Sequence, residues 1–178
     1  MKPETRLTGL PPVFDADIRV LILGSFPSPA SLAAQRYYGH RQNQFWRLLG
    51  AVLEEPLPEL DYPERLSRVL THHVGIWDTF QSCIRPGALD ADIRMGAIND
   101  FPALLRQTPR LQHVCFNGQT AARFASKALA NFGFTTVTLP SSSPAYTLAF
   151  ERKLALWRAG IPLLPQLSQS PACRRGFT

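Results

Sequence analysis

Four short apolar runs alternate with helical segments along this chain, and this alternation limits the fold more than any other feature. The runs lie at residues 19–24, 74–77, 112–116 and 134–139, and helical patterns lie at 43–53, 63–70, 101–107, 119–130 and 147–159. Strands that alternate with helices form a parallel sheet covered by helices on both faces. We therefore predict a single-domain, three-layer α/β/α fold with a central four-stranded, mainly parallel sheet.

The length of 178 residues fits one domain with an ordinary core. We see no repeat and no linker, so we expect one domain over residues 1–160 and a partly ordered tail over 161–178. Segments 1–16 and 81–95 show no clear period and are expected to be irregular. No apolar run reaches the ~18 residues of a membrane span, and the polar start lacks a signal region, so we expect a cytoplasmic protein with no membrane partner.

The net charge and the cysteine content indicate which kinds of partner and which kinds of site the chain can have. The formal net charge of +6 and the pI of about 9.7 suit a polyanion such as nucleic acid. Cys83, Cys115 and Cys173 are odd in number and widely spaced, which fits neither a disulfide framework nor a metal cluster. Cys115 lies in an apolar run and is expected to be a small buried side chain.

Two small-residue loops each follow a predicted strand. The first, Gly-Ser-Phe-Pro-Ser, covers residues 24–28, and the second, Pro-Ser-Ser-Ser-Pro-Ala, covers 140–145. In a parallel sheet both lie at the same edge, where open α/β folds bind ligands. Backbone N–H groups and serine hydroxyls in such loops can hold a phosphate. The alternative is two ordinary turns whose serines cap helices.

An aromatic segment after the first loop carries further candidates. Tyr37 and Tyr38 either stack on a flat base or pack in the core. Asn43 offers an amide near the same sheet edge, or it caps the following helix. His40 either contacts phosphate or satisfies a backbone carbonyl, and Asp78, at the end of a strand, favours a structural hydrogen bond over a ligand contact.

Several other chemistries lack their motifs. The chain contains no G-x-x-x-x-G-K-[ST] phosphate loop and no G-x-S-x-G nucleophile turn. It also lacks the H-x-E and C-x-x-C pair that holds zinc in nucleobase deaminases.

A set of short motifs between about residues 18 and 158 identifies a likeness to a known family. The motifs are Leu23-Gly24-Ser25-Phe26-Pro27 with Ser31-Leu32, Tyr37-Tyr38-Gly39-His40, Asn43-Gln44-Phe45-Trp46, Gly75-Ile76-Trp77-Asp78, Cys83-Ile84-Arg85-Pro86-Gly87, Phe116-Asn117-Gly118 and Leu139-Pro140-Ser141-Ser142-Ser143-Pro144-Ala145. Together they resemble the uracil-DNA glycosylase superfamily, and within it the hypoxanthine-DNA glycosylase branch, family 6.

The resemblance implies a monofunctional DNA glycosylase that hydrolyses the N-glycosidic bond of deaminated bases, hypoxanthine first, and leaves an abasic site. Phe26 stands where the superfamily usually has Asp or Asn, and the second loop lacks its usual His or Asn, so the resemblance to family 6 gives the catalytic role to Asn43. Tyr146 stands where an Asn is frequent.

The remaining site residues divide into two groups by the same resemblance. The base-binding pocket is expected to contain Gly24, Ser25, Phe26, Tyr38 and Asn117. Contacts to DNA phosphates are expected from Ser28, His40, Ser141, Ser142, Ser143, Pro144 and Ala145. The implied partner is DNA that contains a deaminated base, bound by a monomer without metal or cofactor.

Two alternatives stay open. One is a mismatch-specific glycosylase that removes uracil or thymine opposite guanine. The other is a non-catalytic nucleic-acid-binding protein that keeps the fold, which the replaced positions in both loops would allow.

Overall fold

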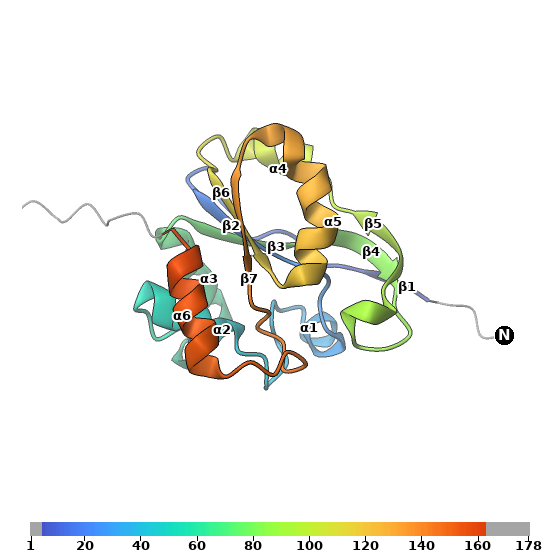
Figure 1. Ribbon diagram of the computed structural model, residues 1–178, viewed down its shortest axis with the longest axis horizontal. Helices are drawn as coiled ribbons and strands as arrows, with labels where there is room; N and C mark the ends of the chain where they lie inside the picture. The colour runs from blue at the N-terminus through green and yellow to red at the C-terminus, as the bar shows by residue number, and fades with distance from the viewer. Residues whose placement is uncertain (1–4, 163–178) are drawn as a thin grey trace, which may run out of the picture.

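The computed structural model describes residues 5–162, and its centre is a four-stranded parallel sheet (Figure 1). The strands are β2 (Val20–Gly24), β3 (Val74–Asp78), β6 (His113–Asn117) and β7 (Thr135–Leu139), in the order β3-β2-β6-β7. The predicted parallel sheet is therefore confirmed. The strands end in register, because Gly24 lies opposite Asp78 and Asn117 lies opposite Leu139.

Helices cover both faces of this sheet, as the alternation predicts. Figure 1 shows α2 (Phe45–Leu53), α3 (Tyr62–Thr71) and α6 (Phe150–Gly160) on one side, and α4 (Phe101–Gln107) and α5 (Gln119–Leu129) on the other. Short helical turns lie at α1 (Pro29–Ala34), η1 (Leu57–Glu59), η2 (Asp90–Asp92) and η3 (Ala130–Phe132). Among the described helices none is long and apolar enough to cross a membrane.

The connections leave the two middle strands in opposite directions. The chain passes from β2 to its outer neighbour β3, and from β6 to β7 at the other edge of the sheet. The carboxyl ends of β2 and β6 thus flank a topological switch point, where open α/β sheets bind their ligands. The fold therefore predicts a site beside Gly24 and Asn117.

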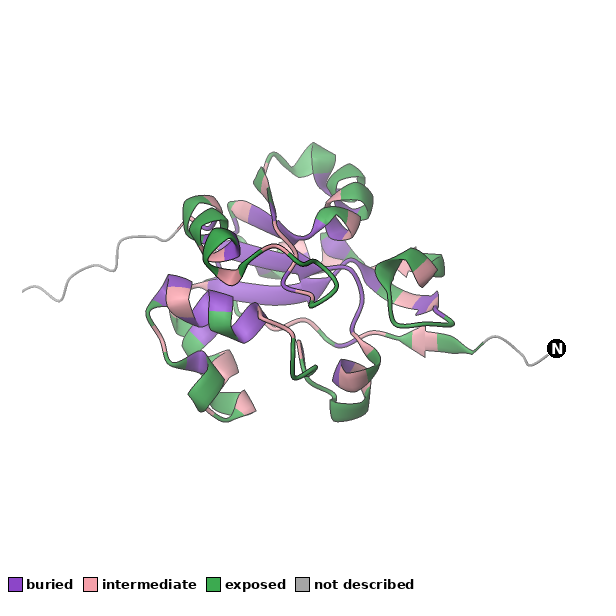
Figure 2. Cartoon of the chain, turned by 60° about the horizontal axis from the view of Figure 1, so that its bottom comes forward, coloured by how far each residue is buried: buried purple, intermediate pink, exposed green. Residues whose placement is uncertain are grey.

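The core lies between the sheet and its two helical layers (Figure 2). All five residues of β2 and all five of β3 are buried, which explains why these strands read as continuous apolar runs rather than as alternating ones. Cys115 is fully buried, as expected. Ile161, in the tail predicted to be partly ordered, is buried against the core, and the predicted tail from 163 onward lies outside the described residues.

A second, antiparallel sheet was not predicted. It contains β1 (Arg6–Thr8), β4 (Phe80–Ile84) and β5 (Arg94–Ile98) in the order β1-β4-β5, so the expectation of irregular structure is wrong where these strands fall within 1–16 and 81–95. The β4–β5 ladder contains two register shifts, and most of β5 is exposed. Both features remove the period-2 pattern that marks a strand. The turn between β4 and β5 reaches over the end of the large sheet.

Capping side chains fix where several helices begin. Asp100 accepts a hydrogen bond from the Ala103 N–H at the start of α4, and Asp61 accepts one from the Glu64 N–H at the start of α3. Two helices begin later than predicted, α2 at Phe45 and α6 at Phe150. The residues before α6 stay extended, with Ala149 at ψ 143°.

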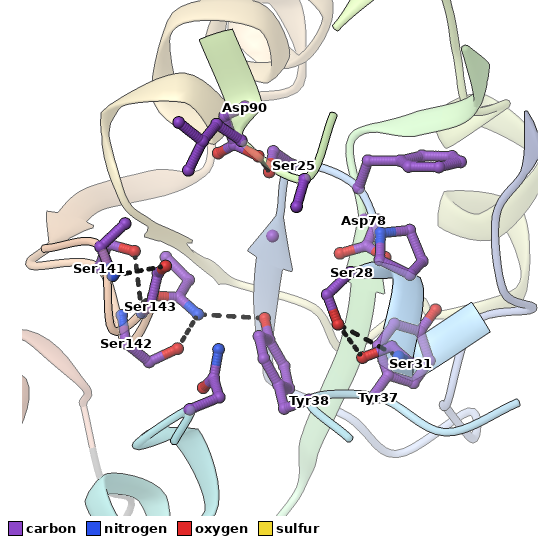
Figure 3. A pocket seen from close by; sticks show the side chains of 18 of the residues that line it. Ser25, Ser28, Ser31, Tyr37, Tyr38, Asp78, Asp90, Ser141, Ser142 and Ser143 are labelled. Atoms are coloured by element: carbon purple, nitrogen blue, oxygen red, sulfur yellow. Dashed lines mark hydrogen bonds between the residues drawn. The ribbon is translucent and has the colours of Figure 1, made fainter. Parts of the chain in front are cut away.

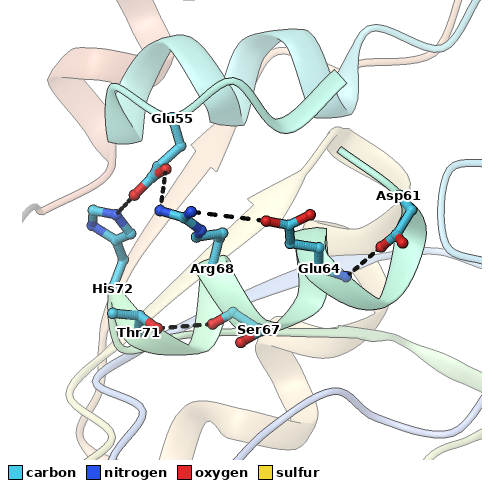
Figure 4. A network of polar contacts seen from close by, with 7 residues as sticks. All are labelled: Glu55, Asp61, Glu64, Ser67, Arg68, Thr71 and His72. Carbon is cyan, nitrogen blue, oxygen red and sulfur yellow. Dashed lines mark hydrogen bonds and ion pairs between the residues drawn. The ribbon is translucent and has the colours of Figure 1, made fainter. Parts of the chain in front are cut away.

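A small polar network fastens α3 to the segment that follows α2 (Figure 4). Glu55 accepts from Arg68 Nη1 at 3.3 Å and lies 2.9 Å from His72 Nε2, while Arg68 also reaches Glu64 at 3.8 Å. This network anchors the helical layer behind the aromatic segment that leads to the site.

Candidate active site

A cavity of about 260 Å³ lies at the switch point between the ends of β2 and β6 (Figure 3). Its wall contains both small-residue loops, the aromatic segment and the turn between β4 and β5. Residues on this wall include Gly24, Ser25, Phe26, Tyr38, Asn43, Asp78, Arg85, Asp90, Asn117 and Ser142. The two loops therefore face each other, as the sheet topology predicts.

The first loop requires glycine at its start. A Cβ at Gly24 would collide with Asp78 Oδ1 and would lie 3.0 Å from the Tyr38 hydroxyl. The next residue, Ser25, donates from its hydroxyl to Asp90 Oδ1 at 2.7 Å. Phe26 packs with Phe80 and contributes to the wall without any polar group. The loop thus brings backbone close to the cavity and joins it to the β4–β5 turn.

The two adjacent tyrosines have different roles. Tyr37 is buried, and its hydroxyl donates to the Pro11 carbonyl at 2.8 Å, so it belongs to the core. Tyr38 stacks on Phe45 with ring centroids 3.7 Å apart, and its φ of 53° holds it in the left-handed region. Burial raises the pKa of Tyr38, so the phenol stays protonated. One ring face of Tyr38 is occupied, and only the other face is left for a base.

Asn117 fastens the second loop to β6. Its Nδ2 donates to Ser142 Oγ at 2.8 Å and to the Tyr38 hydroxyl at 3.1 Å, and its Oδ1 accepts from the Ser142 N–H at 2.9 Å. Asn117 lies on the cavity wall as predicted, but both amide hydrogens are already used. Its contribution is to position Tyr38 and Ser142.

The second loop is braced by its own serines. Ser141 Oγ accepts from the Ser143 N–H at 3.1 Å, and Ser143 Oγ accepts from the Ala145 N–H at 3.2 Å. The hydroxyl hydrogens of these two serines have no acceptor in the described chain. Pro144 is not among the residues on the cavity wall, whereas its neighbours are.

Two residues that were expected to contact DNA phosphates make contacts within the protein instead. Ser28 caps α1, because its Oγ accepts from the Ser31 N–H at 3.1 Å and donates to Ser31 Oγ at 3.0 Å. His40 lies in a neighbouring groove, with its Nδ1 accepting from the Gln42 N–H at 3.2 Å. Ser28 does line the cavity, but its hydroxyl serves the helix.

Asn43 lines the cavity and also supports the start of α2. Its Oδ1 accepts from the Phe45 N–H at 2.9 Å, while the N-cap position of the helix is Gln44, whose side chain makes no capping bond. Among residues 5–162, no acceptor takes the hydrogens of Asn43 Nδ2. The amide therefore combines both of the roles considered for it, with the oxygen holding the helix and the nitrogen left as a donor.

Asp78, for which a structural hydrogen bond was favoured, and Arg85 are charged residues that were not predicted as site residues. Asp78 is 4 % exposed and Arg85 5 % exposed, and both line the cavity. The backbone carbonyl of Asp78 accepts from Asn99 Nδ2 at 2.8 Å, but its carboxylate Oδ2 is buried without a partner in the described chain. Burial, and next the charge of Asp90, raise the pKa of Asp78 to about 7, and Arg85 opposes this effect.

The geometry agrees with what known proteins show. A family model described as the uracil DNA glycosylase superfamily matches residues 11–160. The chain belongs to the uracil-DNA glycosylase superfamily. This finding confirms the resemblance carried by the seven motifs, and the cavity lies between the two loops that contain the first and last of them.

Relatives within the superfamily cover nearly the whole chain. The chain is 38 % identical over 151 residues to a "Hypoxanthine DNA glycosylase" of Methanosarcina acetivorans, covering 85 % of this chain and 95 % of the relative. It is 37 % identical over 149 residues to a protein of the same name from Methanosarcina barkeri, covering 84 % and 94 %. The solution NMR structure of "a putative Uracil DNA glycosylase from Methanosarcina acetivorans" is similar with a TM-score of 0.79 and 37 % identity, covering 87 % of this chain and 96 % of that one.

No group of three or more metal-ligating side chains occurs among the described residues of this superfamily member. His72 Nε2 lies 2.9 Å from Glu55 Oε1, and His72 is not among the residues that line the cavity.

Proposed function

We propose that this chain is a DNA glycosylase that hydrolyses the N-glycosidic bond of deaminated bases, hypoxanthine first, and leaves an abasic site. The observation that carries the proposal is the free Nδ2 donor of Asn43 in a cavity at the switch point of a uracil-DNA glycosylase fold. The names of the two Methanosarcina relatives support hypoxanthine as the first substrate.

The reaction begins when the target nucleotide leaves the base stack. Extrusion costs a few kcal/mol and is easiest at a mispair. In the cavity the free face of Tyr38 stacks on the base. Asn43 Nδ2 either donates to the leaving base or holds the attacking water. The C1′–N bond breaks with its electron pair going to the base, the water oxygen bonds to C1′, and the water proton neutralises the leaving base.

Phosphates that flank the target are assigned to the second loop. The unused hydroxyl hydrogens of Ser141 and Ser143 are suitable donors to phosphate oxygens. The buried Ser142 keeps this loop against Asn117 and, through its carbonyl, against the Gln44 N–H at 3.0 Å. Rigid attachment lets the loop position the strand.

The reaction is assigned as simple hydrolysis rather than as lyase chemistry. Lys153, beneath the second loop, is 1 % exposed, and its Nζ donates to the Ser143 carbonyl at 3.4 Å. Burial lowers the pKa of Lys153, but the residue is not part of the cavity wall. A Schiff base requires a lysine amine at the sugar, so we assign Lys153 a supporting role for the loop.

A cleavage panel tests the function. Duplex and single-stranded oligonucleotides with deoxyinosine, deoxyuridine or deoxyxanthosine are incubated with the protein, and abasic sites are revealed with alkali. We expect release of hypoxanthine to be fastest. Uracil released fastest and only opposite guanine would favour the mismatch-specific alternative, and DNA binding without release of any base would favour the non-catalytic one.

DNA binding is expected to depend strongly on salt. A groove beside the cavity contains Arg36, Arg41, Arg47 and Arg65, and the net charge of the chain is +6. For about four phosphate contacts, affinity should fall roughly 100-fold between 50 and 200 mM salt, because each contact releases condensed counterions. Fluorescence anisotropy with a labelled duplex measures this slope.

Matched arginine variants locate the contacts. Arg41→Ala removes an exposed groove charge and should reduce the salt slope by about one. Arg110→Ala removes an exposed charge that pairs with Asp17 at 2.7 Å, away from the groove, and should leave the slope unchanged. A wild-type affinity for DNA that does not change with salt concentration would contradict DNA binding at this surface.

We further propose that the protein acts as a monomer on chromosomal DNA.

A further inference from the structure

Two opposite charges on the cavity wall have polar atoms that the fold leaves unsatisfied. Asp78 Oδ2, Arg85 Nε and Arg85 Nη1 are buried without hydrogen-bond partners in the described chain. Arg85 uses only its Nη2, which donates to the Pro27 carbonyl at 2.7 Å, and its guanidinium lies 5.2 Å from the centre of the Phe26 ring. Native proteins rarely leave such groups unpaired, so each one requires an explanation.

The two charges lie near each other but do not pair. The charge of Arg85 lowers the pKa of Asp78, yet the two side chains form no ion pair in the described part of the chain. Asp90, the other carboxylate on this wall, is already occupied by the Ser25 hydroxyl. Keeping a carboxylate and a guanidinium buried and apart is unfavourable unless something between them accepts from one and donates to the other.

Deaminated bases present such an edge. Hypoxanthine, xanthine and uracil each carry a ring N–H donor beside a carbonyl acceptor. Adenine carries the reverse, a ring nitrogen acceptor beside an amino donor. A carboxylate beside a guanidinium therefore complements the edge that hypoxanthine shares with guanine, and it opposes the edge of the parent adenine.

We propose that Asp78 and Arg85 read the deaminated edge of the flipped base, with the Asp78 carboxylate accepting the ring N–H and the Arg85 guanidinium donating to the adjacent carbonyl. This inference rests on the proposed glycosylase function and adds specificity-determining residues to it. Asn117, whose amide is used by Tyr38 and Ser142, does not compete for this role.

If Asp78 accepts the ring N–H, the rate of hypoxanthine release should depend on the protonation state of Asp78 and therefore on pH. The groups that interact electrostatically with this carboxyl are Asp90, Arg85 and the phenols of Tyr37, Tyr38 and Tyr62. As the acceptor of a ring N–H, Asp78 works best when ionised. Release of hypoxanthine should therefore rise between pH 6 and 8. A general acid that protonates the base would give the opposite trend.

The test combines variants of the pair with base analogues. Single-turnover rates are measured for wild type, Asp78→Asn and Arg85→Lys on duplexes that contain deoxyinosine, deoxyadenosine or deoxynebularine, whose purine lacks both the ring N–H and the carbonyl. Each variant should slow hypoxanthine release about 10- to 100-fold, the discrimination that a good bidentate base contact provides. Release of the nebularine base, slow already, should hardly change.

The analogue series separates reading from support of the fold. Asp78→Asn should also lower the ratio of hypoxanthine to adenine release, because an asparagine amide can both donate to and accept from the adenine edge. Arg85→Lys keeps the positive charge but removes the guanidinium that holds the Pro27 carbonyl. If this only made the first loop more mobile, the release of hypoxanthine and of the nebularine base would slow equally. Equal slowing of hypoxanthine and nebularine release in both variants would overturn the proposal, as would a wild-type rate that falls from pH 6 to 8.

A control variant and the wild type show whether a negative result contradicts base recognition by Asp78 and Arg85 or the proposed glycosylase function itself. Asp17→Asn makes the same chemical change at an exposed side chain that pairs with Arg110, and it should leave every rate unchanged. If the wild type releases no hypoxanthine, the proposed function fails. If it does release hypoxanthine and Asp78→Asn keeps the wild-type rate and selectivity, only the reading by Asp78 and Arg85 fails.

Discussion

Asn43→Ala is expected to lower the single-turnover rate of hypoxanthine release about 10²–10³-fold. The loss of one polar group that stabilises a transition state typically has this effect. The variant also removes the acceptor for the Phe45 N–H, which should reduce stability by about 1 kcal/mol. The rate and the unfolding free energy are measured on the same preparation, with a deoxyinosine duplex as substrate.

Asn43→Asp distinguishes the role of the amide oxygen, which supports the helix, from the role of the amide nitrogen, which is the proposed catalytic donor. An aspartate can accept the Phe45 N–H as well as asparagine does, but it offers no donor in place of Nδ2. If Nδ2 performs the catalytic work, Asn43→Asp should be stable and slow. Full activity of Asn43→Asp would mean that only the helix contact matters, and an unchanged rate in Asn43→Ala would remove the residue from the mechanism.

The matched control is Asn131→Ala. Asn131 is exposed in η3, which lies just before β7 in the chain, and it is not part of the cavity wall. Its replacement should change neither the rate nor DNA binding. A comparable loss of activity there would indicate a general effect of the substitution rather than a role of the Asn43 amide.

The large sheet could be predicted because burial on both faces leaves a plain sequence signal. The strands β2 and β3 are almost continuous apolar runs, and they end in Gly24 and Asp78 at the edge where the site forms. The two facing loops followed from parallel topology alone. The small sheet could not be predicted, because the mostly exposed β5 and the shifted β4–β5 register leave no alternation to detect.

The candidate site could also be predicted only in part. Asn43, Tyr38 and Asn117 were placed near the cavity by motif resemblance, and they do line it. What the sequence could not give is which polar atoms the fold already uses. The polar groups of Asn117 and Ser28 are occupied, whereas Asp78 Oδ2 and two nitrogens of Arg85 are not. The sequence signals for these two residues were the G-I-W-D and C-I-R-P-G motifs and the place of Asp78 at the end of a strand. Local spacing does not show which hydrogen-bond partners a residue meets across the fold.

Asp78→Asn is expected to stabilise the protein at pH 8 and to have little effect near pH 4. The pKa of Asp78 in the folded chain is about 7, above its ordinary value of 3.8, so the folded state holds this proton more tightly than the unfolded state does. Its contribution to stability is therefore greatest below pH 4 and is lost as the pH rises toward 7. A difference of about three pH units corresponds to roughly 4 kcal/mol, because each unit is worth about 1.4 kcal/mol.

The buried asparagine amide will offset part of this gain, since an unsatisfied polar group costs about 1–3 kcal/mol. A net gain of about 1–3 kcal/mol at pH 8 should therefore be visible in urea unfolding, and it should shrink as the pH falls. Asp17→Asn, at an exposed carboxylate, should show no such pH-dependent difference from the wild type. Parallel pH profiles for the wild type and Asp78→Asn would show that Asp78 is not held at a raised pKa.

The expected gain in stability and the expected loss of activity concern the same carboxylate. An ionised Asp78 without a partner destabilises the empty protein, and a ring N–H donor in the cavity would relieve that cost on binding. Sites that bind and react commonly keep such unfavourable groups, and substitutions that stabilise them then reduce function. If Asp78→Asn is more stable at pH 8 and slower on hypoxanthine but not on nebularine, the stability and selectivity effects have one cause, the unpaired charge beside Gly24.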